Sequence, residues 1–315
     1  MNYKELGLDN TRAMFAKAMN GAYAVPAFNF YNMESLQAIM AAAQATHSPV
    51  ILAVSESALA YMGENLLTGI IYGQKDRWAK GQFALHLDHG HSFESCRRAI
   101  DLGFSSVMID GSELPFSENI ALTRQVAEYA HSRDVSVEAE LGALAGIEDE
   151  NTRGEKSSYT DPTQVAEFAA ATNCDSLAVA IGTSHGAYKR KNESEELRFD
   201  ILAEIAKLLP EFPLVLHGAS QIPQNLVAEI NANGGAIGGA RGIPTDQIRR
   251  AVAMNVCKIN VDSDGRLAWT AAIRETAAKT PESFDPRKFL TAARDKMTAL
   301  YMDEIKNVMG SDNKI

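Results

Sequence analysis

The stretch Phe83–His91 (FALHLDHGH) is a short apolar run that ends in polar, titratable side chains. Its apolar part is typical of a buried strand, and Asp88 and His89 come where that strand should end. A carboxylate beside a histidine at a strand end could act as an acid/base group next to a metal ligand. Taken alone, the stretch fits an ordinary turn with a hydrogen-bonded histidine at least as well, so the rest of the chain has to decide.

Three of the seven histidines, His89, His185 and His217, stand at the expected ends of three strands, and each is followed by glycine. Three protein ligands with one or two open positions is the arrangement of a catalytic zinc site. His91 offers an alternative as the second member of an H-x-H pair, which some barrel metallohydrolases use. The helix-start residues that follow it make it the weaker candidate. The other histidines are interpreted as caps at helix ends or as a core or supporting group: His47, His131 and His86.

The elements that must position these residues alternate between apolar strands and helical patterns. The predicted strands are Tyr23–Asn29, Pro49–Ser55, Phe83–His91, Ser106–Asp110, Val135–Leu141, Ser176–Gly182, Pro213–His217 and Val256–Val261. The predicted helices are Met33–Thr46, Glu64–Lys80, Phe93–Leu102, Glu118–Arg133, Thr163–Thr172, Phe199–Leu209, Gln224–Ala232, Arg266–Lys279 and Arg287–Met309. Near-continuous apolar strands are buried on both faces, as in parallel sheets. We therefore predict one domain over residues 1–315, a (β/α)8 TIM barrel with a C-terminal helical extension.

An open dinucleotide-binding sheet is less favoured, because no G-x-G-x-x-G follows the first strand. Two long loops, Ala143–Thr160 and Asn233–Pro244, are expected to be functional lids or insertions. In a barrel, the active site lies where strands end and the following loops begin. Polar side chains occur at each of these ends. Besides the histidines, they are Asn29, Ser55, Asp88, Asp110, Glu138, Glu140, Asn260, Asp262, Ser263 and Asp264.

Three loops after the last strands carry small or hydroxyl-bearing residues, and the first two also contain glycine: Gly182–Gly186, Gly218–Ser220 and Asn260–Ser263. Backbone N–H groups and small residues cradle phosphate groups. Barrels commonly hold a phosphate group after their last strands. Tight turns are the alternative, but they do not account for three such loops side by side.

Composition limits the classes of partner. The net charge of −10 argues against a nucleic-acid or membrane-surface binder, but leaves room for an anionic substrate held by local cations. The three cysteines lie in separate elements without a C-x-x-C pattern, which favours free thiols. The N-terminus lacks a signal-peptide pattern, and no apolar run could span a bilayer. A cytoplasmic protein with a small-molecule partner is expected.

With these residues in view, the chain resembles the class II (zinc-dependent) fructose-1,6-bisphosphate aldolases along its whole length. The motifs that carry the resemblance are AVPAFNF (24–30), LHLDHG (85–90), SFESCRRAI (92–100), SVMIDGS (106–112), SVEAELG (136–142), IGTSHGAYK (181–189), LVLHGAS (214–220), KINVDSD (258–264) and FDPRKFL (284–290). There are two departures. The loop Gly142–Glu148 lacks the glycine pair that many members carry before the acid, and Asn233–Pro244 is an insertion relative to shorter members.

The resemblance implies three catalytic residues. Asp88 would handle the proton of the C4 hydroxyl, Glu148 would exchange the proton on the dihydroxyacetone phosphate carbon, and Asn260 would steady the enediolate. The implied metal residues are the zinc ligands His89, His185 and His217, with Glu140 and Asp110 where a displaced or second cation lies. The implied substrate-binding residues are Asn29, Ser55, Gly186, Lys189, Gly218, Ser220, Asp262, Ser263, Arg266 and Arg287. The loops of Gly186 and Gly218 also match a site for a monovalent cation, Na⁺ or K⁺. Arg266 and Arg287 are candidates for binding the distal phosphate, from the same subunit or from a neighbouring subunit of a homodimer or homotetramer.

The expected reaction is reversible aldol cleavage of fructose 1,6-bisphosphate to dihydroxyacetone phosphate and glyceraldehyde 3-phosphate, with zinc polarising the ketone and stabilising the enediolate. Tagatose-1,6-bisphosphate is the alternative substrate; the acidic Asp262 favours fructose. Other classes stay open. Lys258 could form a Schiff base, although a strand-start lysine in an ion pair is the simpler reading. A metallohydrolase could use His89 and His91, and a non-catalytic sugar-phosphate binder would not need both Asp88 and Glu148.

Overall fold

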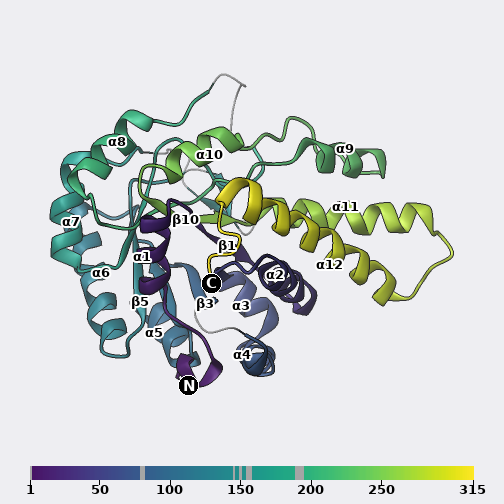
Figure 1. The fold of residues 1–315 in the computed structure, drawn as a ribbon, viewed down its shortest axis with the longest axis horizontal. Helices are drawn as coiled ribbons and strands as arrows, with labels where there is room; N and C mark the ends of the chain where they lie inside the picture. Colours follow the sequence, from purple (N-terminus) through teal and green to yellow (C-terminus); the bar gives the residue numbers. More distant parts are fainter. Residues whose placement is uncertain (1, 79–81, 145, 149–150, 154–157, 189–194) are drawn as a thin grey trace.

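The computed structural model is a closed barrel of eight parallel strands in the order β1-β10-β9-β8-β5-β4-β3-β2 (Figure 1). The strand bounds are β1 Val25–Asn29, β2 Val50–Ser55, β3 Phe83–Gly90, β4 Ser106–Ile109, β5 Ser136–Leu141, β8 Ser176–Val179, β9 Leu214–Leu216 and β10 Val256–Val261. Every residue of these strands is buried, as expected for strands covered on both faces. The predicted (β/α)8 barrel is therefore confirmed.

The structure describes residues 2–78, 82–144, 146–148, 151–153, 158–188 and 195–315, without the side chains of 147, 148 and 151–153. The predicted strand ends are close to the observed ones, and the largest difference is in β8, which ends at Val179 instead of Gly182. The reason is that Ala180 bonds to Thr160 and not to a neighbouring strand. Its N–H donates to Thr160 Oγ1 at 2.8 Å, and its carbonyl accepts the Thr160 N–H at 3.0 Å.

Helices cover the outside of the barrel (Figure 1). Their bounds are α1 Thr11–Gly21, α2 Met33–Thr46, α3 Glu56–Met62, α4 Glu64–Tyr72, α5 Phe93–Leu102, α6 Phe116–His131, α7 Val165–Thr172, α8 Phe199–Leu208, α9 Gln224–Ala232, α10 Thr245–Val252, α11 Ser263–Lys279 and α12 Pro286–Asp303. A π-helical segment, Glu304–Met309, continues α12. Capping boxes begin α2 at Asn32 and α5 at Ser92, so the chain leaves the strand ends directly into helices.

One predicted helix was too long, and three observed helices, α1, α3 and α10, were not predicted. The predicted helix Glu64–Lys80 ends at Tyr72, and a separate helix, α3, precedes it. Gly63 separates the two, because its φ of 80° lies outside the helical region. Helices α1 and α10 were not predicted, although Asn10 caps α1 by accepting the Arg12 N–H.

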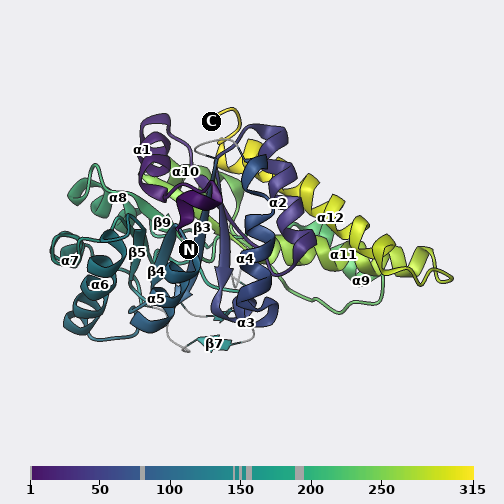
Figure 2. The same cartoon turned by 90° about the horizontal axis from the view of Figure 1, so that it is seen from below.

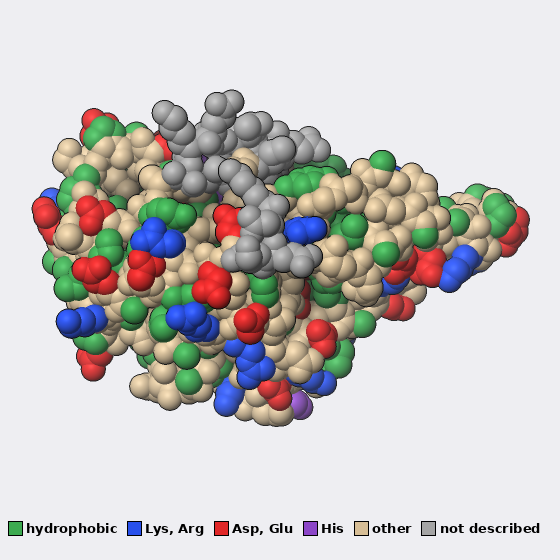
Figure 3. All heavy atoms as spheres, turned by 90° about the horizontal axis from the view of Figure 1, so that it is seen from above, with side chains coloured by type: hydrophobic (Ala, Val, Ile, Leu, Met, Phe, Trp, Pro, Cys, Tyr) green, Lys and Arg blue, Asp and Glu red, His purple; other side chains and the backbone are tan. Residues whose placement is uncertain are grey.

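The C-terminal extension is a long antiparallel pair, α11 and α12, that projects away from the barrel (Figures 1 and 2). Phe284, in the connection at its tip, is 94% exposed. On the described part of the face in Figure 3, acidic and basic side chains are interspersed along the body and the projection. None of the described helices has the length and hydropathy needed to cross a membrane.

The long loop after β5 contains a small antiparallel hairpin, β6 Gly146–Glu148 and β7 Asn151–Arg153, at the end of the barrel where α3 begins (Figure 2). Gly146 forms an isolated bridge with His185. A Cβ at Gly146 would lie 2.5 Å from the His185 carbonyl oxygen, so only glycine allows this approach. The hairpin therefore borders the loop that carries a predicted metal ligand.

Candidate active site

The end of β3 has an irregular backbone that brings two consecutive side chains to one place. Neighbouring residues of a strand normally point to opposite faces. Here the pairing of β3 with β4 shifts register between Leu87 and Gly90, and His89 has a left-handed φ of 51°. Non-glycine residues adopt such a φ rarely, and often at functional sites. Asp88 Oδ1 consequently lies 4.0 Å from His89 Nε2, with both side chains buried.

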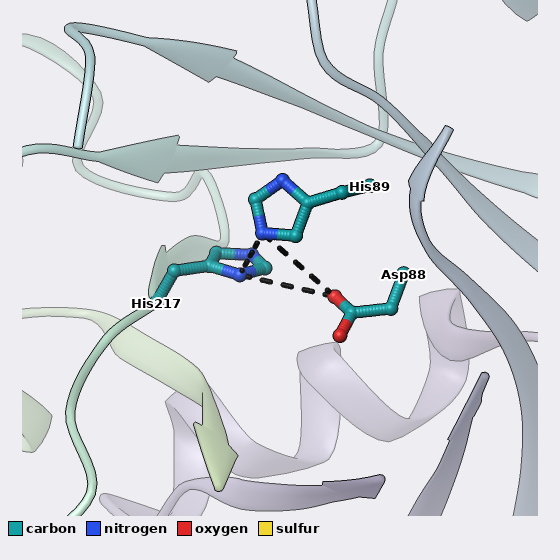
Figure 4. Close-up of side chains that lie close together, drawn as sticks. All are labelled: Asp88, His89 and His217. Atoms are coloured by element: carbon teal, nitrogen blue, oxygen red, sulfur yellow. Dashed lines mark hydrogen bonds and ion pairs between the residues drawn. The ribbon is translucent and has the colours of Figure 1, made fainter. Parts of the chain in front are cut away.

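His89 and His217 direct one ring nitrogen each toward a common point (Figure 4). His89 Nε2 lies 2.9 Å from His217 Nδ1. Their opposite nitrogens bond to carboxylates: His89 Nδ1 lies 2.9 Å from Asp110, and His217 Nε2 lies 2.7 Å from Glu138. A carboxylate on one imidazole nitrogen fixes the tautomer and leaves the other nitrogen available to a metal.

His185 lies beside this pair. Its ring centroid is 5.1 Å from that of His89 and 6.4 Å from that of His217, in edge-on and tilted arrangements. Among the described residues, two groups have ligand atoms within 4.8 Å of one another: Asp88, His89 and His217, and His89, Asp110 and Glu140. His185 adjoins these groups without belonging to them.

The donor set fits a metal ion. Burial, followed by the neighbouring His89 and Lys258, lowers the pKa of His217 to about 4. A neutral imidazole is the form that ligates. Three imidazoles with carboxylates nearby are the ligands that zinc prefers over magnesium or calcium.

Asp88 is held by two side-chain amides. Asn29 Nδ2 donates to one carboxylate oxygen at 2.7 Å, and Asn260 Nδ2 donates to the other at 2.8 Å. The amide oxygens of both asparagines are buried and have no hydrogen-bond partner within the described part of the chain. Burial alone would raise the pKa of Asp88, but the nearby imidazoles, His89 first, lower it below its ordinary value. Asp88 is therefore an ionised carboxylate in a fixed position.

A charged network lies one strand layer below the histidines. Lys258 Nζ is 2.7 and 2.9 Å from the carboxylate oxygens of Glu138 and 3.3 Å from His86 Nε2. His86 Nδ1 in turn lies 2.8 Å from Ser106 Oγ. Burial would raise the pKa of Glu138, yet Lys258 and His217 hold it below its usual range. Lys258 thus forms the ion pair that the sequence suggested as the simpler reading.

The sequence did not identify Glu138 as the group that orients His217. A signal was available in the spacing of polar residues along the strands. Residues at i and i+2 share a face of a strand, and three strands carry such polar pairs: Glu138 and Glu140, His86 and Asp88, and Lys258 and Asn260.

The loops after β8 and β9 lie in direct contact. Gly218 has a φ of 61°, and a Cβ there would lie 2.6 Å from the Ser184 carbonyl oxygen. Ser220, next in this loop, is 3% exposed. Ser263 begins α11, so its N–H belongs to a helix N-terminus, where anions are favoured. The structure thus brings together two of the three predicted phosphate-binding loops. The third loop is joined to them through the next residue, Asp264, whose carboxylate accepts the N–H groups of Gln221 and Ile222.

The chain matches the family model for "Fructose-bisphosphate aldolase class-II" over residues 9–314. It belongs to this family. Class-II aldolases are metal-dependent aldehyde-lyases, and the resemblance predicted from the motifs is confirmed.

Named relatives of this aldolase span nearly its whole length. The fructose-bisphosphate aldolase of Treponema pallidum (strain Nichols) is 50% identical, covering 98% of this chain and 98% of its own. That of Thermus caldophilus is 49% identical, covering 89% of this chain and 90% of its own. Among solved structures, the YdjI aldolase from Escherichia coli K12 has a TM-score of 0.76 and 28% identity, covering 98% of this chain and 99% of that one.

Three predicted substrate-binding residues of the aldolase make contacts within the chain. Ser55 Oγ caps α3 by accepting the Ala58 N–H at 3.2 Å. Arg266 is paired with Asp262 at 2.8 Å at the edge of the site. Arg287 is at the far end of α11, a helix of 17 residues, or about 25 Å, and pairs with Asp285 at 2.7 Å. The structure does not bring Arg287 to the site within one chain.

Five further residues of the sequence predictions lie away from the site or outside the described structure. Lys189 and the side chain of Glu148 lie outside the described residues. His91 is exposed, in keeping with its lower rank as a ligand. The predicted helix-end positions of His47 and His131 are confirmed, since they are the C-cap of α2 and the last residue of α6.

Proposed function

We propose that Asp88 and the adjacent histidines carry out the reversible aldol cleavage of fructose 1,6-bisphosphate to dihydroxyacetone phosphate and glyceraldehyde 3-phosphate. One observation supports this most strongly. An ionised carboxylate, held by two amides, lies 3.9 Å from His217 Nδ1 and 4.0 Å from His89 Nε2. A base and the binding place of an electron-withdrawing ion are thus side by side, which is what breaking a carbon–carbon bond next to a ketone requires.

Zinc is the metal that we propose, held by His89, His185 and His217. A zinc ion bound there would withdraw electrons from the substrate ketone without a covalent imine. Asp110 and Glu138 would orient the ligating rings of His89 and His217, and Glu140 lies 3.8 Å from His89 Nδ1. We further propose that the loops of Gly186 and Gly218 bind a monovalent cation, Na⁺ or K⁺.

Asp88 would take the proton of the C4 hydroxyl as the C3–C4 bond breaks. Asn29 and Asn260 hold both of its oxygens, which limits the directions in which it can accept a proton. A positioned acid/base group contributes roughly 10²–10⁴-fold to a rate. The amide oxygen of Asn260, which has no partner among the described residues, is available to a substrate hydroxyl. Glu148 would exchange the proton on the dihydroxyacetone phosphate carbon.

Gly218, Ser220 and Ser263 would bind one phosphate group of the substrate, with Gly186 and Lys189 alongside. The other phosphate needs a cation. Arg266 is already paired with Asp262, and the Arg287 side chain is 86% exposed at the end of a projecting hairpin. We therefore propose a homodimer or homotetramer in which Arg287 reaches the site of a second copy, with the exposed Phe284 beside it.

We propose the cytoplasm as the place of action. The three cysteines are free and buried, which suits a reducing compartment. A glycolytic role follows from the proposed substrate.

The test is a cleavage assay that compares fructose and tagatose bisphosphates before and after treatment with a chelator. The proposal expects chelator-sensitive release of glyceraldehyde 3-phosphate, faster from the fructose substrate, and no trapping by borohydride. Faster cleavage of tagatose bisphosphate would reassign the substrate. Hydrolysis without release of glyceraldehyde 3-phosphate would replace the aldolase by a metallohydrolase.

A further inference from the structure

Asp264, the second residue of α11, is fully buried and ties the start of that helix to the loop after β9. One carboxylate oxygen accepts the N–H of Gln221 and the other accepts the N–H of Ile222, both at 2.7 Å. Asp264 directly follows Ser263, and Gln221 directly follows Ser220. The carboxylate therefore joins the two segments that carry the proposed phosphate-binding residues.

The loop held by Asp264 has an unfavourable backbone. Ile222 has a φ of 53°, in the left-handed region that β-branched residues strongly avoid. Such a conformation persists only where the surroundings fix it. A second contact comes from the far side, where the Ile243 N–H donates to the Ser220 carbonyl at 3.0 Å. The loop is thus fixed from two sides, and Asp264 provides one of them.

Glu304, in the π-helical segment after α12, is 1% exposed and lies against Asp264. As an ionised group, its two oxygens would have no hydrogen-bond partner within the described residues. A proton on Glu304 would allow it to donate to the neighbouring Asp264 carboxylate. Burial, and then the Asp264 carboxylate, raise the pKa of Glu304 well above its ordinary value. Burial beside the Asp264 carboxylate therefore favours the protonated form of Glu304.

The C-terminal segment that carries Glu304 is anchored next to the site. Tyr301 stacks on Phe28 of β1, with ring centroids 4.1 Å apart, and Phe28 precedes Asn29. A Cβ at Gly265 would lie 2.2 Å from Tyr301 Oη, so the start of α11 and the end of α12 meet without an intervening side chain. Glu304 is consequently held on rigid elements.

We propose that Asp264 and the adjacent buried Glu304 act together as positioning residues, which hold Gly218–Ile222 against Ser263 so that the loop can bind a substrate phosphate group. This inference rests on the proposed function, because it takes the phosphate-binding role of Gly218, Ser220 and Ser263 as given.

The experiment uses the metal-loaded, full-length enzyme, with inorganic phosphate as a competitive probe beside the bisphosphate substrate. D264N removes one of the two acceptors and places an amide N–H against a backbone N–H. It should raise both the inhibition constant of phosphate and the KM roughly tenfold, while metal stoichiometry stays at the natural value and kcat changes less than KM. E304A should behave in the same way, because Asp264 loses its donor.

E304Q is the decisive conservative variant, because its amide can donate to Asp264 as the protonated acid does. It should restore the phosphate inhibition constant to within about twofold of the natural value. E282Q, at an exposed position, is the matched control. An unchanged phosphate inhibition constant in D264N would overturn the proposal. If D264N does not fold, equal phosphate binding in E304A and E304Q would overturn it instead.

A separate variant distinguishes failure of this inference from failure of the proposed function. S263A keeps the backbone N–H and removes the hydroxyl, which we also place on the phosphate group, so it should weaken phosphate binding. If S263A weakens phosphate and D264N does not, the positioning role is wrong and the phosphate assignment stands. If neither variant affects phosphate, the phosphate assignment itself is wrong.

Discussion

The charged network under the metal site makes a demanding prediction for Lys258→Met. Lys258 is fully buried, and its ammonium is the only cation that the described structure places against Glu138. Methionine has a similar length and no charge, so the substitution leaves Glu138 as a buried carboxylate that is hydrogen-bonded to His217, with His86 Nε2 3.9 Å away. Removing one member of a buried ion pair costs about 3–5 kcal/mol. That is a large part of the total stability of a domain, about 5–15 kcal/mol.

Part of this cost should appear as weaker metal binding. Glu138 fixes the tautomer of His217, and it can do so only while its charge is compensated. With Lys258 gone, Glu138 takes up a proton more easily. A protonated Glu138 could donate to His217 Nε2 instead of accepting from it, so the tautomer of His217 would no longer be fixed. Losing the partner that orients a metal ligand typically lowers metal affinity about 10–100-fold. We expect this range for Lys258→Met.

The assay is denaturant unfolding of the metal-free protein, because bound metal would add its own stabilisation. Metal affinity is measured separately by competition with a chelator. The matched control is Lys207→Met on the exposed side of α8, which should change the free energy of unfolding by less than about 0.5 kcal/mol. The double variant Glu138→Gln/Lys258→Met removes both charges and should recover most of the lost stability. A loss below about 1 kcal/mol for Lys258→Met, or a double variant no more stable than the single one, would refute the reasoning.

Three further predictions concern the proposed metal ligand His217, the buried acid Glu304, and Arg287 at the tip of the α11–α12 pair. His217→Ala should lose bound metal while the barrel still folds, as measured by metal analysis and circular dichroism; retained stoichiometric metal would remove His217 from the ligand set. Glu304 binds a proton in the folded state at pH values where the unfolded chain has released it, so stability should fall as pH rises from about 4.5 through its raised pKa. The titratable groups next to Glu304 are Asp264, Asp303 and Tyr301. Glu304→Gln should abolish this slope in denaturant midpoints measured across pH, and a slope that survives in this variant would contradict the origin. Arg287→Ala should raise the KM for the bisphosphate and leave the unfolding midpoint unchanged, and an unchanged KM would exclude a contribution from a second copy.

The barrel could be predicted from the sequence because its strands are buried on both faces. Strands of this kind appear as unbroken apolar runs, and the change to polar residues at Asn29, Ser55 and Asp88 marks their ends. The same property made the candidate site predictable, since all eight ends meet at one rim. Helix α4 was less predictable, because the pattern after Gly63 stays amphipathic beyond Tyr72, where the helix ends.

Contacts across the barrel could not be predicted from local patterns. The pairing of Lys258 with Glu138 joins residues 120 positions apart and depends on the register of the closed barrel. The left-handed backbone at His89 accompanies a register shift in the pairing of β3 with β4. No residue type in the sequence indicates this shift. Likewise, Glu304 meets Asp264 only because the α11–α12 hairpin returns to the barrel. Interactions of this kind need the folded geometry.

The central claim is that Asp88 takes the C4 hydroxyl proton beside a bound metal ion. It is tested most directly in Asp88→Ala by comparing two reactions of the same metal-loaded sample. One is cleavage of fructose 1,6-bisphosphate. The other is exchange of the carbon-bound proton of dihydroxyacetone phosphate with deuterated water, followed by nuclear magnetic resonance. We predict that cleavage falls roughly 10²–10⁴-fold, while metal content and proton exchange are retained. Cleavage at the natural rate in Asp88→Ala would contradict the account.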